Sequence, residues 1–163
     1  MDKHFELTDK FIINAFGAKL FQIKCTRKIK YADIGDLGGY IEKEDNLSGN
    51  AWVSGNAWVY GDAWVSGNAQ VYGDAWVYGD AWVSGNAQVS NNNEHCGFDC
   101  FGSANCHTHS YKTKSGKIEI TCGCFRGSIE EFEKQIKETH RGNEFERQYM
   151  AIVEVIKIKF GLK

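Results

Sequence analysis

A chain of 163 residues is long enough for one ordinary domain or two small ones. Hydrophobic residues at 42% and charged residues at 25% lie near the globular average, which excludes a disordered or low-complexity chain. The net charge of −2 excludes a strongly basic nucleic-acid coat and a strongly acidic DNA mimic, so we do not expect nucleic acid as a partner. There is no proline, where average usage would give roughly eight, and this absence predicts extensive backbone pairing.

The sequence contains neither a membrane span nor a signal peptide, and this bears on the compartment of the protein and on the state of its cysteines. No segment reaches the roughly 18 apolar residues of a membrane span, so we expect no membrane partner. The first ten residues are charged and lack the apolar run of a signal peptide, which predicts a cytoplasmic protein. In that compartment the six cysteines are expected to be reduced thiols or metal ligands rather than disulfides.

Residues 1–40 are predicted to form an N-terminal β cap. The stretches 3–8, 10–16 and 19–29 have strand-like composition, with turn signals at Asp9-Lys10 and at Gly17-Ala18. A cap of this kind would cover the unpaired strand edge at one end of a repeat structure.

Basic residues gather near the end of this cap. Lysines on an edge strand prevent aggregation, so a solvated edge is the simplest interpretation. The alternative is a phosphate-binding patch, in which Lys24, Arg27 and Lys28 contact the ligand.

From residue 41 to residue 94 the sequence repeats every six residues. Nine hexads begin at 41, 47, 53, 59, 65, 71, 77, 83 and 89, with the pattern Val-x-Gly-(Asn/Asp)-Ala-x. A helix turns through about 600° over six residues, so the valines would not stay on one side of it. The period therefore predicts a β architecture for 41–94.

This pattern resembles the hexapeptide repeat of left-handed parallel β-helices. The resemblance implies a triangular prism of three coils, with the aliphatic residue and the alanine inside. Glycine with Asn or Asp would form each corner, because these residues tolerate turn dihedrals. The predicted fold is mainly β: a left-handed parallel β-helix with the N-terminal β cap and a C-terminal α+β module at 95–163.

In such a prism, residues eighteen apart stack, and all five tryptophans, Trp52 included, point outward. Columns of exposed rings are typical of an interface, although they could instead pack on the chain's own terminal segments. Hexapeptide-repeat proteins are commonly trimers, so the resemblance implies a homotrimer or another homo-oligomer. The predicted oligomer or partner interface consists of Tyr40, Trp58, Tyr60, Trp76, Tyr78, Trp64 and Trp82.

Residues 95–163 are predicted to contain about two strands and two helices. A hairpin over 107–125 turns at Ser115-Gly116. Ser128 and Glu131 match a capping box that opens a helix ending near residue 140, and Asn143 with Glu146 matches a second one. The apolar face of the last helix is predicted to be Phe145, Tyr149, Ile152, Val153 and Ile156.

Cysteine and histidine are dense between residues 95 and 124. A structural zinc held by Cys96, Cys100, Cys106 and His109 is one interpretation, since zinc takes four such ligands. The spacing is irregular, however, so buried thiols with surface histidines are the simpler interpretation and no cofactor is expected.

Several segments together resemble a family of bacteriophage and prophage proteins with hexapeptide repeats. They are FQIKCTRKI, GDLGGYIEKEDNLS, the NAWVSG and NAWVYG hexads, and YKTKSGKIEITCGCFRGSIEEFEKQIKETH. The resemblance implies a non-enzymatic, oligomeric binding protein used for counter-defence in the host cytoplasm. It would block a host immune effector or sequester a nucleotide signal between subunits, with Trp and Tyr stacking a base and Arg126, Arg141 or the Lys24–Lys30 cluster holding phosphate.

Two other functions stay open. A hexapeptide-type acyl-CoA-dependent acyltransferase shares the prism but needs a histidine base near a cleft between subunits, and the five histidines all lie outside the hexads. The third possibility is a structural assembly protein, for which the prism is a stackable rod.

Overall fold

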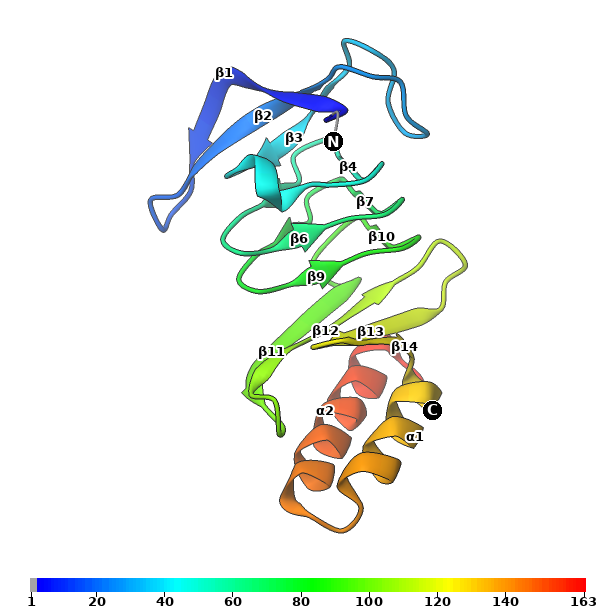
Figure 1. The fold of residues 1–163 in the computed structure, drawn as a ribbon. Coiled ribbons are helices and arrows are strands. Elements are labelled where there is room, and N and C mark those ends of the chain that lie inside the picture. Colours follow the sequence, from blue (N-terminus) through cyan, green and yellow to red (C-terminus); the bar gives the residue numbers. More distant parts are fainter. Residues whose placement is uncertain (1–2) are drawn as a thin grey trace. The chain divides into compact units, whose positions relative to one another are not determined.

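The computed structural model describes residues 3–163 and divides the chain into two compact units, the first ending at Asn92 and the second beginning at Asn93 (Figure 1). The first unit begins with an antiparallel sheet of β1 (Phe5–Ile13), β2 (Lys19–Cys25) and β3 (Leu37–Ile41). The turn at Gly17 is confirmed, with φ at +85°.

The turn predicted at Asp9-Lys10 is wrong. β1 runs through these residues as one strand, and its register against β2 shifts between Leu7 and Phe11. A β-bulge of this kind absorbs the local turn signal without breaking the strand.

The hexads form two-residue strands that pair in parallel with residues eighteen positions away. Trp52 pairs with Gln70, Trp58 with Trp76 and Trp64 with Trp82, which confirms the predicted period. Within residues 3–92 the parallel stacks are β3-β5-β8, β4-β7-β10 and β6-β9. The repeat elements are η1 (Glu44–Asn46), β4 (Trp52–Val53), β5 (Trp58–Val59), β6 (Trp64–Val65), β7 (Gln70–Val71), β8 (Trp76–Val77), β9 (Trp82–Val83) and β10 (Gln88–Val89).

The valines and alanines of the hexads form the interior of this unit, and Val53 through Val89 are all fully buried. In the seven hexads that begin between residues 47 and 83, the corner residue is a glycine with a positive φ. Gly67 has φ at +69°, and a Cβ added there would lie 2.9 Å from the backbone nitrogen of Gly85 in the next coil. Neither the dihedral nor the spacing admits a side chain.

Two further glycines let the cap pack closely on the repeat. A Cβ on Gly38 would lie 2.5 Å from the carbonyl oxygen of Val53, and one on Gly39 would lie 2.7 Å from that of Ala57. Because both carbons are absent, β3 approaches the repeat backbone and joins β5 as a parallel neighbour.

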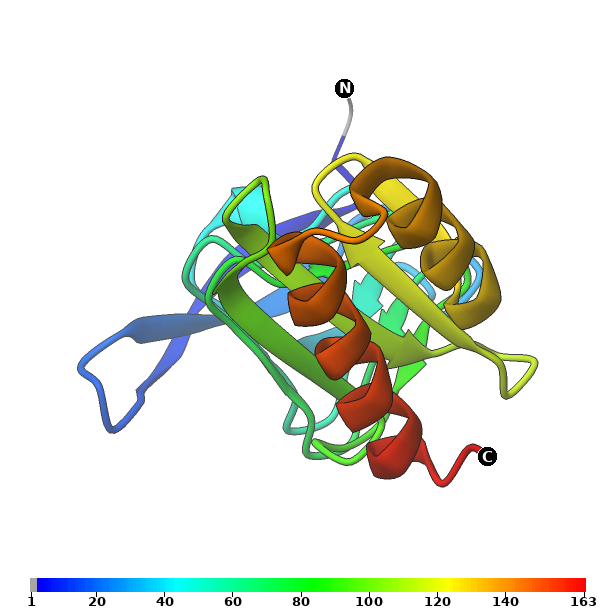
Figure 2. The same cartoon turned by 90° about the horizontal axis from the view of Figure 1, so that it is seen from below.

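The second unit is an antiparallel sheet with two helices on one face (Figures 1 and 2). Its four strands correct the prediction of about two, because β11 and β14 lack the alternation that marks a strand. Residues 93–163, all described, contain β11 (His95–Phe101), β12 (Cys106–Lys112), β13 (Ile118–Cys122), β14 (Phe125–Ser128), α1 (Ile129–His140) and α2 (Glu144–Phe160).

Helix capping largely follows the prediction. Ser128 Oγ accepts from Glu131 N at 3.2 Å, and Glu131 Oε2 accepts from Ser128 N at 2.7 Å. Asn143 caps α2 as expected, but the Glu146 carboxylate accepts from Gly142 N, so this box is shifted by one residue. Within residues 3–163, no helix is long and apolar enough to cross a membrane.

Replacing a buried repeat valine by an acid is expected to unfold the first unit. Val71→Asp places an unpaired charge in a fully buried position, which costs roughly 3 kcal/mol or more. The matched control is Tyr78→Asp, because Tyr78 is 54% exposed. Urea unfolding followed by circular dichroism should show a large drop in midpoint for the first variant only. If Val71→Asp cannot be purified, Val71→Thr, which keeps the shape and adds a hydroxyl, should still lower the midpoint more than Tyr78→Thr.

Candidate functional site

The predicted aromatic columns are present on the first unit. The rings of Trp58 and Trp76 stack with centroids 4.7 Å apart and planes 1° from parallel. Tyr60 and Tyr78 stack at 5.3 Å beside them. The structure therefore brings four of the predicted interface residues together as a flat aromatic surface: Trp58, Tyr60, Trp76 and Tyr78.

A groove of about 470 Å³ runs over this surface. Its floor is apolar, and on its rim Asn56 Nδ2 donates to Asp74 Oδ1 at 3.3 Å. Trp76 is still 39% exposed. An apolar floor with a polar rim is the usual anatomy of an interface. The residues that line the groove are Ile12, Tyr40, Asn56, Trp58, Asp74, Trp76 and Asn92.

Trp52 departs from the expected exposure. It is 2% exposed, and the ring of His4 lies against it with centroids 6.2 Å apart. The N-terminal segment therefore covers this tryptophan. For Trp52, the alternative prediction that the rings pack on the chain's own terminal segments is confirmed. Trp64 and Trp76 keep about two fifths of their surface exposed.

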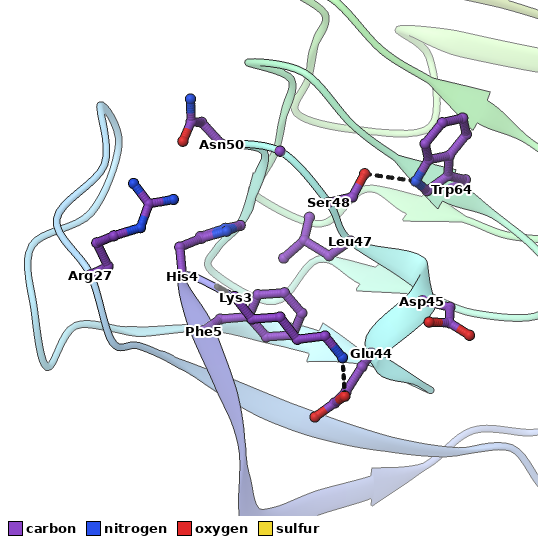
Figure 3. Close-up of a pocket in the computed structure, with 11 residues that line it drawn as sticks. Lys3, His4, Phe5, Arg27, Glu44, Asp45, Leu47, Ser48, Asn50 and Trp64 are labelled. Carbon is purple, nitrogen blue, oxygen red and sulfur yellow. Dashed lines mark hydrogen bonds and ion pairs between the residues drawn. The ribbon is translucent and has the colours of Figure 1, made fainter. Parts of the chain in front are cut away.

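A second hollow, of about 650 Å³, lies beside the first coil (Figure 3). Two residues that were predicted to have separate roles line it together: Arg27, predicted as a phosphate ligand, and Trp64, predicted as part of an interface. The lining residues are Lys3, His4, Phe5, Arg27, Glu44, Asp45, Leu47, Ser48, Gly49, Asn50 and Trp64.

The charges of this cavity are unevenly paired. The Lys3 ammonium contacts the Glu44 carboxylate, so the two largely neutralise each other. Arg27 is exposed and has no ion-pair partner among the described residues. His4 Nε2 donates to the Ala51 carbonyl oxygen at 2.8 Å. Burial lowers the pKa of His4, the bond to Ala51 opposes this, and the Arg27 charge lowers the pKa further.

The other predicted basic ligands lie elsewhere. Lys24 is 3.4 Å from a Glu6 carboxylate oxygen, and Lys28 is 2.7 Å from one of Asp33. Arg126 pairs with Glu119 at 3.2 Å in the second unit, and Arg141 is the C-cap residue of α1. Of the five predicted residues, only Arg27 lines the cavity.

The structure does not bring the four predicted zinc ligands together. Cys96 pairs with Ser110 across β11 and β12, whereas His109 pairs with Gly97, so the two side chains lie on opposite sheet faces. Cys106 Sγ lies 3.5 Å from Cys122 Sγ, and Cys100 is exposed. Across residues 3–163, no three His, Cys, Asp or Glu side chains are arranged to hold a metal ion.

Sequence reasoning missed a histidine cluster in β11 and β12. His95 and His109 are buried rather than on the surface, and His95 Nδ1 lies 3.0 Å from His109 Nε2. His107 hydrogen bonds to the Asp99 carboxylate through Nδ1. The alternation His107-x-His109 in a strand was the available signal, because it puts both rings on one face.

Comparison with known proteins bears on the repeat alone. The family model of the YdcK beta solenoid repeat matches residues 51–67 and 69–85. Residues 51–85 are therefore similar to a beta-solenoid repeat, which agrees with the parallel stacks described for the first unit. The sequence has no significant match among curated proteins.

Buried His4 is expected to make the first unit sensitive to acid. Its pKa is lowered in the folded chain, so the unfolded chain binds a proton first as the pH falls below the ordinary value of 6.5. The free energy of unfolding should therefore fall, relative to that of His4→Gln, between about pH 7 and pH 5. Gln keeps a donor for Ala51 and does not titrate. Denaturant curves whose difference is independent of pH would show that His4 is not held neutral.

Thiol reactivity is expected to separate buried from exposed cysteines. Burial raises the pKa of Cys122 to about 11, so its thiolate is scarce at pH 8. Cys100 and Cys124 are exposed and should react first with a disulfide reagent, as read by peptide mass spectrometry. Labelling of Cys122 as fast as Cys124 in the folded chain would contradict this environment.

Proposed function

We propose that the chain is a phage-encoded, non-enzymatic binding protein built on a left-handed β-helix of three coils. It assembles with copies of itself and acts in counter-defence in the host cytoplasm. The observation that carries this proposal is the stack of Trp58 on Trp76, which floors an open groove on the solenoid surface.

The groove is the binding surface in this proposal. Stacked indoles are rigid and bring a large apolar area at little cost in side-chain entropy, as in interface hot spots. Asn56 and Asp74 supply polar groups at the rim.

The occupant of the groove in this proposal is a second copy of the chain. The hairpin of β1 and β2 extends beyond the coils of the first unit (Figure 2), and it exposes Phe11 (45%), Ile13 (64%) and Phe16 (84%). Its lysines, Lys10 and Lys19, complement the acidic hexads that carry the groove. One copy therefore supplies an apolar, basic arm, and another supplies an apolar, acid-rimmed groove.

The assembled protein would block a host immune effector or sequester a nucleotide signal. The phage resemblance of the sequence supports the setting. Arg27, which has no ion-pair partner among residues 3–163, lines the same cavity as Trp64, and this supports a nucleotide. Binding is favoured over acyl transfer because His4, whose ring lies against Trp52 of the solenoid, already uses Nε2 to donate to the Ala51 carbonyl oxygen.

Removing the stacked tryptophans is expected to break the assembly. The double variant Trp58→Ser/Trp76→Ser should shift the mass measured by light scattering to that of a single chain, because the apolar floor is lost. Trp64→Ser is the matched control, since Trp64 is 42% exposed and lies outside the groove. A double variant that keeps the native mass, or a native chain that is already a single 18.4 kDa species, would contradict the proposed interface.

A further inference from the structure

The second aromatic column ends at the cavity rather than at another ring. Trp64 and Trp82 stack with centroids 5.4 Å apart and planes 14° from parallel. Leu47 pairs with Val65, so the residue in register before Trp64 is Asn46. Where the hexad pattern elsewhere often has tryptophan, the first coil has an amide.

Asn46 turns inward and does not cover the indole. It is fully buried, and its Nδ2 donates to the carbonyl oxygens of Ala63 at 2.8 Å and Gly61 at 3.1 Å. Trp64 remains 42% exposed and lines the cavity. The column is therefore one ring short at this position.

The open ring is held in place before any ligand arrives. Trp64 Nε1 donates to Ser48 Oγ at 2.8 Å, and Trp82 supports the ring from within the column. A fixed, half-exposed indole next to a cavity is a stacking platform for a planar ring, and stacking on such a platform accepts any nucleobase.

The far end of the cavity has the chemistry of an anion site. Figure 3 shows Arg27 and Asn50 on one side and Trp64 with Asp45 on the other. Arg27 has no ion-pair partner among the described residues, whereas Lys3 is already paired with Glu44. A guanidinium in this state is suited to a bidentate phosphate contact.

The middle of the cavity suits the uncharged part of such a ligand. Phe5 and Leu47 give it apolar wall, and the lowered pKa of His4 keeps that ring neutral. Asp45 also lines the cavity, on the side of Trp64, and its carboxylate is the hydrogen-bond acceptor at that end (Figure 3). The cavity is thus polarised, with an acceptor at the aromatic end and a cation at the other.

We propose that this cavity binds an elongated nucleotide, with a base stacked on Trp64 and a phosphate held by Arg27. Because the two residues lie at opposite ends, the ligand class is a dinucleotide or a nucleoside diphosphate sugar rather than a single short nucleotide. The inference deepens the nucleotide-capture part of the proposed function, and it places capture within one chain instead of between subunits.

Isothermal titration calorimetry on the full chain tests the site with ADP-ribose and cyclic di-AMP as probes. Inorganic phosphate and adenosine, which each reach one end, should bind at least about tenfold more weakly than the better probe. Arg27→Gln and Trp64→Leu should each weaken that probe by roughly tenfold or more, and Trp64→Phe should recover part of the loss. The matched control is Phe101→Leu, which removes a ring that is 42% exposed in the second unit, outside both the groove and the cavity, and it should bind as the native chain does.

Two results would overturn the inference. One is the absence of measurable binding by either probe at millimolar concentration, and the other is native affinity in Trp64→Leu or Arg27→Gln. Light scattering on the same samples separates this failure from that of the proposed function. An assembled chain without nucleotide affinity refutes this site alone, and a monomer that binds nucleotide refutes the self-association alone.

Discussion

The first unit depends on one constraint, the hydrogen-bonded pairing of each hexad with the hexad three places later. Ser54 N donates to Val71 O at 2.9 Å, and Tyr72 N donates to Val89 O at 2.9 Å, so the same contact recurs from coil to coil. Side chains at equivalent positions are then forced into columns. Valine columns make a dry interior, glycine columns make the corners, and tryptophan columns make the surfaces on which the functional argument rests.

The same constraint explains why small departures from the repeat matter. Asn46 stands where a ring would continue the column of Trp64, and its amide nitrogen donates to the carbonyl oxygens of Gly61 and Ala63. That single change leaves a half-exposed indole beside a cavity. On the other face the column of Trp58 and Trp76 continues from Tyr40, so the surface there is unbroken and forms a groove instead.

The repeat could be predicted from sequence because its information is local and is written many times. Val71, Gly67 and Trp76 each occupy the position that their hexad slot implies. The predictions that were wrong concern features that depend on contacts between distant segments. The burial of Trp52 by His4 and the continuous strand through Asp9 leave no periodic trace. In the second unit, β11 was missed because a strand of Cys, Gly and Asp lacks the β-branched residues that mark most strands.

The candidate sites likewise divide into one that the repeat predicts and one that only the folded chain reveals. The stacking of Trp58 on Trp76 followed from the period, whereas the meeting of Arg27 with Trp64 required the fold of the cap against the first coil. The account as a whole claims that these aromatic surfaces bind other molecules. Native mass spectrometry of the unmodified chain tests that claim most directly. The account predicts an assembly whose mass is a multiple of 18.4 kDa plus the mass of a retained ligand. The ligand, released by heat, should absorb at the wavelength of nucleobases. A single bare chain at every protein concentration would contradict it.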